Sequence, residues 1–169
     1  MSFQELMTQR YSVRKFTDQP ISPEDMALLL ESARVAPTAA NLQPQRIYVA
    51  QTAEDHAKID LCTSCCFGAP VVFIICYDAD ACWVRSRFDQ KTSGEVDASI
   101  VTTHMVLQAQ ALGLGTTWVM HFNPEEAVRQ FNLPDNIIPI ALLPTGHPAP
   151  DAKPSEKHGL RMSVEDMLL

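Results

Sequence analysis

Polar side chains recur at every second position near the amino terminus: Arg10, Ser12 and Arg14. In an extended segment, alternate side chains point to the same side, so two guanidinium groups and one hydroxyl would face a single ligand. Guanidinium groups bind phosphate through charge-assisted hydrogen bonds. The spacing therefore predicts a site for an anion such as phosphate, although an ordinary solvated basic turn would show the same pattern.

A second unusual segment, residues 37–44, is small and polar and is bounded by two prolines. It comes directly after a predicted helix. Its amide side chains, Asn41 and Gln43, could hold a planar heterocycle, because an amide group both donates and accepts hydrogen bonds. A simple turn is the alternative interpretation of this segment.

Three cysteines lie close together, at Cys62, Cys65 and Cys66. Thiolates this close could share one soft metal ion such as zinc. A second pair of ligands with the usual spacing is missing, so we favour thiols that are buried and inert, and we expect no metal. The odd total of five cysteines, in a chain with no export signal, indicates free thiols rather than a disulfide framework.

The sequence contains none of the common nucleotide-loop, nucleophile-elbow or metalloprotease motifs. Gly113 and Gly115 follow a predicted helix, so we interpret them as its end and not as a nucleotide loop. His104 lies inside that apolar helix and is predicted to be a hydrogen-bonded core histidine. No acid–base pair can be assembled from the sequence, and we expect no catalytic side chain.

Capping residues and periodicity predict the elements that must position these residues. Helices are expected after Ser2, from residue 22 to about 36, at 53–62, at 96–112 and after Asn123. Strands are expected at 46–51, 71–77, 116–120 and 137–143, with the last confined to an edge or a bulge by Pro139. The strand at 71–77 is apolar on both faces, which is typical of the centre of a sheet.

Helices and strands do not alternate strictly, which favours an α+β fold over a doubly wound one. We predict a three-layer α/β/α sandwich. No repeat or linker divides the sequence, so residues 1–169 are expected to form one domain with an extended tail from about residue 146.

Composition excludes several classes of protein. A chain with 46% hydrophobic and 20% charged residues can bury a continuous core, unlike a disordered one. The net charge of −7 and the scattered basic residues make nucleic acid a poor partner. The longest apolar run, residues 70–77, is far shorter than the roughly 20 residues of a membrane span, and no signal peptide is evident. We expect no membrane partner and a cytoplasmic location.

The motif Arg-x-Ser-x-Arg-x-Phe at residues 10–16, followed after a helix by Pro-Thr-Ala-Ala-Asn-Leu-Gln-Pro, resembles the opening of the FMN-dependent nitroreductase family. The resemblance continues at residues 69–74, at 111–118 and at 143–148. It implies the family's fold, with a mainly antiparallel central sheet, and a homodimer that holds two FMN molecules between its subunits.

The resemblance also implies roles for individual residues. The FMN phosphate and ribityl chain would meet Arg10, Ser12, Arg14 and Arg161. The isoalloxazine would be lined from the other subunit by Pro37, Thr38, Ala39, Asn41 and Gln43. The backbone of Met120 and His121 would reach the reactive nitrogen.

This sequence departs from the family at three places. Gln45 replaces a common aromatic residue, and the segment 78–94 is short. At the pyrimidine edge of the flavin, Thr63, Ser64 or backbone groups would have to replace the family's usual side chains.

By this resemblance the chain is an oxidoreductase that uses FMN and NAD(P)H to reduce nitroaromatics, quinones or a related electron-poor molecule by a ping-pong mechanism. The flavin would perform the redox chemistry, which explains why no catalytic side chain is needed. Two alternatives stay open. One is a non-catalytic protein that binds or stores flavin, and the other is a metal-binding regulatory domain built on Cys62, Cys65 and Cys66.

Overall fold

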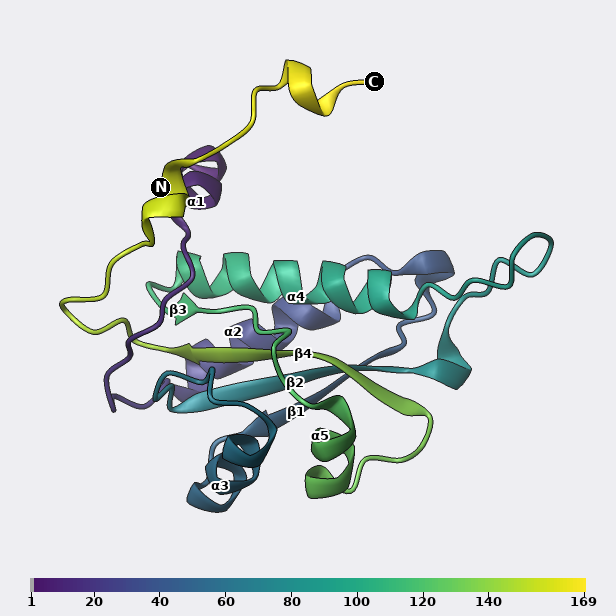
Figure 1. The fold of residues 1–169 in the computed structure, drawn as a ribbon, viewed down its shortest axis with the longest axis horizontal. Coiled ribbons are helices and arrows are strands. Elements are labelled where there is room, and N and C mark those ends of the chain that lie inside the picture. Colours follow the sequence, from purple (N-terminus) through teal and green to yellow (C-terminus); the bar gives the residue numbers. More distant parts are fainter. Residues whose placement is uncertain (1) are drawn as a thin grey trace.

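The computed structural model describes residues 2–169 and places a four-stranded sheet between two helical layers (Figure 1). The strands are β1 (Gln45–Ala50), β2 (Val71–Asp78), β3 (Gly115–Thr116) and β4 (Ile137–Gly146), in the order β1-β2-β4-β3 and all antiparallel. One face is covered by α2 (Pro23–Arg34) and α4 (Gly94–Ala111), and the other by α3 (Ala53–Cys62) and α5 (Pro124–Phe131). The predicted three-layer sandwich with a mainly antiparallel sheet is confirmed.

Strand β2 forms the centre of the sheet because both of its faces are apolar. Phe73 and Ile75 pack with α2 and α4, whereas Val72 and Ile74 pack toward α3 and α5. All four side chains are fully buried. The continuous apolar run therefore predicted the central strand correctly.

Capping side chains begin the helices where the sequence predicted them. Ser2, Ser22, Thr52 and Asn123 each accept a hydrogen bond from a backbone N–H of the first turn that follows. Gly113, with a φ of +75°, follows the end of α4 as the predicted left-handed residue. The short first helix is α1 (Phe3–Gln9).

Pro139 lies in a bulge, as predicted. Cys76 pairs with Pro139 while Ile75 pairs with Ala141, so one extra residue of β4 is accommodated there.

The strand predicted at residues 116–120 is wrong in its extent. Strand β3 ends at Thr116, and beyond it only Val119 forms a bridge, to Leu142. The reason is Pro144, which accepts a hydrogen bond from the Thr117 N–H at 3.1 Å but has no N–H to donate in return.

The prediction for His104 is also wrong. Its side chain is half-buried and lines a surface groove with α1 and α2, not the core. Because α4 is apolar on nearly all sides, its periodicity does not show which side faces the sheet.

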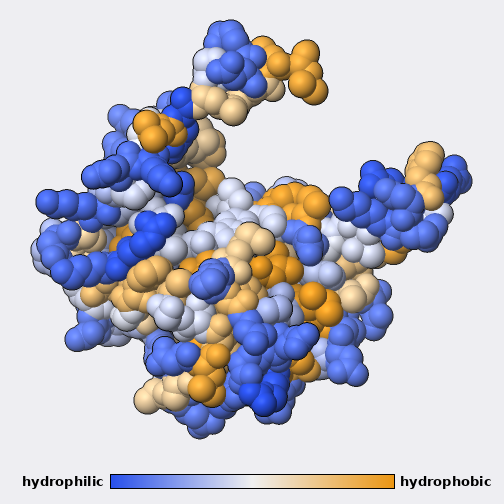
Figure 2. All heavy atoms as spheres, viewed as in Figure 1, coloured by the Kyte–Doolittle hydropathy of each residue, from blue (hydrophilic) through white to orange (hydrophobic). Residues whose placement is uncertain are grey.

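Two segments project from the layer that contains α4 (Figure 1). One is a hairpin at residues 83–92, closed by a bridge between Val84 and Thr92. The other is the tail, which includes the short 3-10 turns η3 (Glu156–Gly159) and η4 (Glu165–Met167). Figure 2 shows hydrophobic residues on this tail, where Val164, Met167 and Leu168 are exposed. No helix within residues 2–169 is long and apolar enough to cross a membrane.

Candidate functional site

The segment at residues 10–14 runs beside β3 and is fixed by its buried residue. Val13 is 2% exposed, its N–H donates to the Thr116 carbonyl at 2.9 Å, and its carbonyl accepts a hydrogen bond from the Thr117 hydroxyl. The alternate side chains, Arg10, Ser12 and Arg14, therefore point away from the core. All three line one pocket of about 170 Å³, as the alternation predicted.

The tail supplies the other wall of this cationic pocket. Lys157, His158 and Arg161 line it together with Tyr11 and Ser155. Among residues 2–169, no carboxylate lies within ion-pair distance of the cations of this pocket, which are Arg10, Arg14, Lys157 and Arg161. Several uncompensated positive charges converge there although the chain has a net charge of −7. Such a pocket favours a phosphate-type anion.

An apolar groove continues from the cationic pocket along α4. Its first part, of about 340 Å³, shares Arg10 and Ser12 with the pocket and adds Thr103, Val106 and Leu107 of α4, with Thr116 and Trp118 opposite. Its second part, of about 250 Å³, shares Trp118 and extends to Met120 and to Glu95 near the beginning of α4. The groove can therefore take a flat apolar group whose charged end lies in the pocket.

The segment at residues 37–43 lies away from the cationic pocket, near the beginning of α4. The Ala39 N–H donates to Oδ1 of Asp97 at 2.8 Å, near the amino-terminal end of α4, whereas the first part of the groove, which shares Arg10 and Ser12 with the cationic pocket, lies beside the other half of that helix. Nine residues separate Asp97 from Val106, which is roughly 13 Å along a helix. Figure 1 shows the two segments at opposite ends of α4. One chain thus does not bring Pro37, Thr38, Ala39, Asn41 and Gln43 to the cationic pocket.

Met120 lies at the far part of the groove, and His121 follows it in the chain. The Met120 side chain is exposed and lines it, and the His121 carbonyl accepts a hydrogen bond of 2.6 Å from the Thr63 hydroxyl. Within residues 2–169, neither the Met120 nor the His121 backbone N–H has an acceptor. The Thr63 hydroxyl, in contrast, is already engaged.

The cysteines show no sign of metal chemistry. Burial raises the pKa of the Cys66 thiol to about 12 and also raises that of Cys62, so both stay protonated at neutral pH. Among residues 2–169, no three His, Cys, Asp or Glu side chains are placed to hold one metal ion. The metal-binding alternative therefore gains no support from the structure.

Comparison with known proteins decides the family. The model of the nitroreductase family matches residues 7–64 and 61–147. This chain belongs to the nitroreductase family. It is 38% identical to a nitroreductase family protein from Clostridium difficile 630, whose crystal structure aligns with a TM-score of 0.93 over 100% of this chain and 98% of that one.

Other nitroreductase relatives carry names that mention cofactors. A crystal structure from Desulfovibrio desulfuricans, in complex with FMN, is 25% identical, with a TM-score of 0.80 over 100% of this chain and 96% of that one. A Bacillus subtilis protein named FMN reductase, NAD(P)H, is 27% identical over 85% of this chain, which spans 64% of that protein's length.

Sequence reasoning missed three residues in or near the candidate site. Lys157 and His158 were not singled out, because the tail has no periodicity that would place it beside Arg10. Asp97 was not noticed either, since a carboxylate in the first turn of a helix usually serves only the helix dipole. Its buried position, 1% exposed, becomes visible only in the fold.

Proposed function

We propose that this chain is an FMN-dependent oxidoreductase that uses NAD(P)H to reduce nitroaromatics, quinones or a related electron-poor molecule. The observation that carries the proposal is the cationic pocket without carboxylates that opens into an apolar groove. FMN has the same two parts, a phosphate and a flat ring system. The relatives named for FMN and NAD(P)H support this choice of cofactor and reductant.

The residues that would hold the phosphate and ribityl chain are Arg10, Ser12, Arg14 and Arg161, with Lys157 beside them. The free N–H groups of Met120 and His121 would orient the ring by main-chain hydrogen bonds. FMN, when bound, supplies the hydride chemistry. NAD(P)H and the acceptor would occupy the same groove in turn, as a ping-pong mechanism requires.

The other part of the site would come from a second copy of the chain. The distance between the cationic pocket and residues 37–43 supports this arrangement, since each chain holds two half-sites at opposite ends of α4. A stripe at helical spacing on α4, formed by Val96, Ile100, Thr103 and Leu107, is exposed or half-buried and could be covered by the partner. In the dimer, Pro37, Thr38, Ala39, Asn41 and Gln43 would line the partner's flavin.

A flavin-binding protein without turnover is the second candidate. The segment between β2 and α4 favours it, because this segment forms a projecting hairpin and no helix over the groove.

The five free cysteines support the proposed cytoplasmic location.

The test begins with the absorption spectrum of the purified protein. We expect a yellow protein with about one FMN per chain, and steady oxidation of NADH or NADPH when a quinone or nitroaromatic is added. A colourless protein that takes up no FMN would contradict the proposal. Bound FMN without oxidation of either nucleotide would favour the storage function.

Replacing Cys62, Cys65 and Cys66 together by Ser should leave flavin content and turnover near those of the wild type.

A further inference from the structure

The segment at residues 38–43 has an unfavourable backbone conformation. Ala40, Asn41 and Gln43 have φ angles of +50°, +56° and +52°, and none of them is glycine. Left-handed angles are disfavoured for residues with a Cβ atom, so such a loop persists only where its surroundings hold it. Contacts at both ends of the loop hold it in this conformation.

A buried carboxylate holds the beginning of the loop. Oδ1 of Asp97 accepts the Ala39 N–H at 2.8 Å, and Oδ2 accepts the Ser93 hydroxyl at 2.6 Å. Asp97 is 1% exposed, which excludes water from this contact. In such surroundings a charge-assisted hydrogen bond is strong and directional.

Asp97 itself is placed by a tightly packed junction. A Cβ at Gly94 would lie 2.3 Å from the Tyr77 ring, so the beginning of α4 is pressed against β2. The Ser93 N–H donates to the Trp83 carbonyl at 2.9 Å, which ties the same turn to the root of the projecting hairpin. The carboxylate thus sits on a rigid support between the hairpin and the loop.

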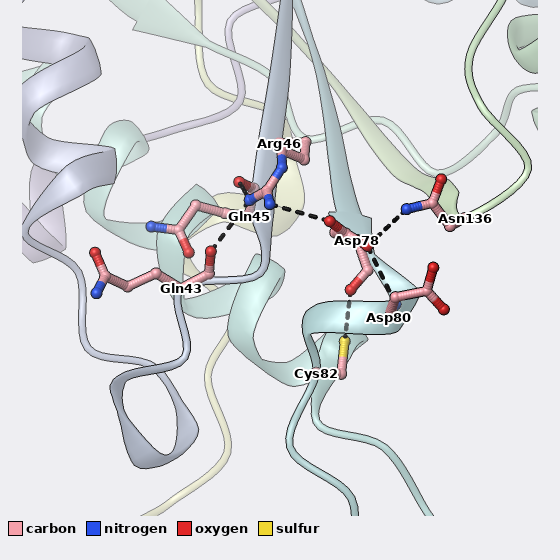
Figure 3. A network of polar contacts seen from close by, with 7 residues as sticks. All are labelled: Gln43, Gln45, Arg46, Asp78, Asp80, Cys82 and Asn136. Carbon is pink, nitrogen blue, oxygen red and sulfur yellow. Dashed lines mark hydrogen bonds and ion pairs between the residues drawn. The ribbon is translucent and has the colours of Figure 1, made fainter.

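The other end of the loop is held by Arg46. Its Nη1 donates to the Gln43 carbonyl at 3.2 Å and to the Gln45 carbonyl at 2.9 Å. Figure 3 shows that its guanidinium lies between these carbonyls and Asp78, whose Oδ2 is 3.0 Å from Nη2. Arg46 is much more exposed than Asp97, so the buried carboxylate is the stronger of the two anchors.

We infer that Asp97, oriented by Ser93, is a positioning residue that holds the loop at residues 38–43 in the left-handed conformation that lines the flavin. This inference rests on the proposed function for the flavin contact. The hydrogen bond between Asp97 and the Ala39 N–H is present in the chain without flavin. Without the carboxylate, the loop relaxes to negative φ angles and loses the shape that meets the isoalloxazine.

The test compares Asp97→Ala, Asp97→Asn and Ser93→Ala with a matched control, Asp55→Ala. Asp55 is also a buried carboxylate that accepts backbone N–H groups, but it lies at the beginning of α3 on the other face of the sheet. Two readouts are taken: hydrogen exchange of the Ala39 and Gln43 amides in the apoprotein, and the Kd for FMN from quenching of its fluorescence.

We expect Asp97→Ala to speed exchange at Ala39 and to raise the Kd for FMN by about tenfold or more, since a hydrogen bond to a charged group is lost. Ser93→Ala should have a smaller effect in the same direction. If Asp97→Ala does not fold, this variant tests whether Asp97 holds the loop. Asp97→Asn should fall between the wild type and Asp97→Ala, because its amide oxygen can accept from Ala39 and its NH₂ can donate to Ser93, but without the charge. Adding Ala40→Gly to Asp97→Ala should restore part of the FMN binding, as glycine tolerates a positive φ.

Asp55→Ala should lower the melting temperature without changing either readout. The inference is overturned if Asp97→Ala and Ser93→Ala match Asp55→Ala in both the exchange and the Kd. If the wild type binds no FMN, the proposed function fails, and the exchange at Ala39 still decides whether Asp97 holds the loop.

Discussion

At the scale of single residues, the basic side chains of the cationic pocket differ from most of the others. Six of the others, including Lys15, Arg34 and Arg129, form surface ion pairs with nearby carboxylates. Those of the cationic pocket form none within residues 2–169. Cations that repel one another destabilise the chain unless an anion joins them. The convergence of these cations is thus better explained by a bound anionic ligand than by a contribution to the stability of the fold.

Arg10→Ala and Arg161→Ala should each weaken FMN binding by about tenfold or more, because a charge-assisted hydrogen bond contributes roughly 1.5 to 3 kcal/mol. Titration of the apoprotein with FMN measures the effect. Arg129→Ala is the control, since Arg129 pairs with Glu126 on α5, on the far face of the sheet. Full flavin retention in both pocket variants would show that the phosphate does not bind there.

The sequence alone predicted only part of the candidate site. The alternation at residues 10–14 predicted which side chains share a pocket, because one buried residue, Val13, is enough to orient its neighbours. The contributions of Lys157 and Asp97 depend on contacts between distant parts of the chain. Lys157 comes from a tail without regular structure, and Asp97, which contacts Ala39 in the fold, is 58 residues away from it in the sequence.

At the scale of elements, local capping signals predicted the helices and apolar runs predicted the central strand. Strand β3 was overestimated because its end is decided by Pro144 on another strand. The orientation of α4 could not be predicted from local sequence signals either. A helix that is apolar nearly all round does not reveal which side meets the sheet and which side is left for a partner.

The capping carboxylate of α3 predicts a pH dependence of stability. Although burial opposes it, hydrogen bonds from Thr52, Gln51 and Tyr48 lower the pKa of Asp55 from 3.8 to about 2. Because the folded pKa is lower than the unfolded one, this contribution is complete above pH 3.8 and is lost as the pH falls through about 2. It amounts to about 2 kcal/mol.

Asp55→Asn should therefore lower the free energy of unfolding at pH 7 and flatten its decline between pH 4 and 2. Urea unfolding at several pH values measures both effects. An equally steep decline in the variant would assign the acid sensitivity to other carboxylates.

Gly115 allows the segment at residues 10–14 to lie close against β3. A Cβ there would lie 2.5 Å from Cγ2 and 2.8 Å from Cβ of Val13. Gly115→Ala should push residues 10–14 outward, lowering stability by roughly 1 to 3 kcal/mol and weakening FMN binding. Gly159→Ala is the control, since nothing lies within 4 Å of its added Cβ and the change should be nearly neutral. Unchanged FMN affinity in Gly115→Ala would show that β3 does not determine the position of Arg10 and Ser12.

At the scale of the whole molecule, the two parts that we propose for the flavin site lie apart in one chain. The cationic pocket and the first part of the groove lie toward the carboxyl-terminal half of α4, and the loop at residues 38–43 lies near its amino-terminal end. Two copies related by a twofold axis would bring each pocket to the partner's loop, and a single rotation would complete both sites. The exposed apolar residues of the tail would also be covered in such an arrangement.

The dimer can be tested on its proposed helical surface. Ile100 is half-buried in the single chain and belongs to the exposed stripe of α4, so Ile100→Glu would place a charge in the interface. Sedimentation should then show a monomer, and FMN release and loss of turnover should accompany dissociation, because binding and assembly are linked. Leu61→Glu is the matched control, since Leu61 is an exposed apolar residue of α3 on the opposite layer. An Ile100→Glu monomer that keeps both FMN and turnover would mean that one chain builds the whole site, and that residues 37–43 act elsewhere.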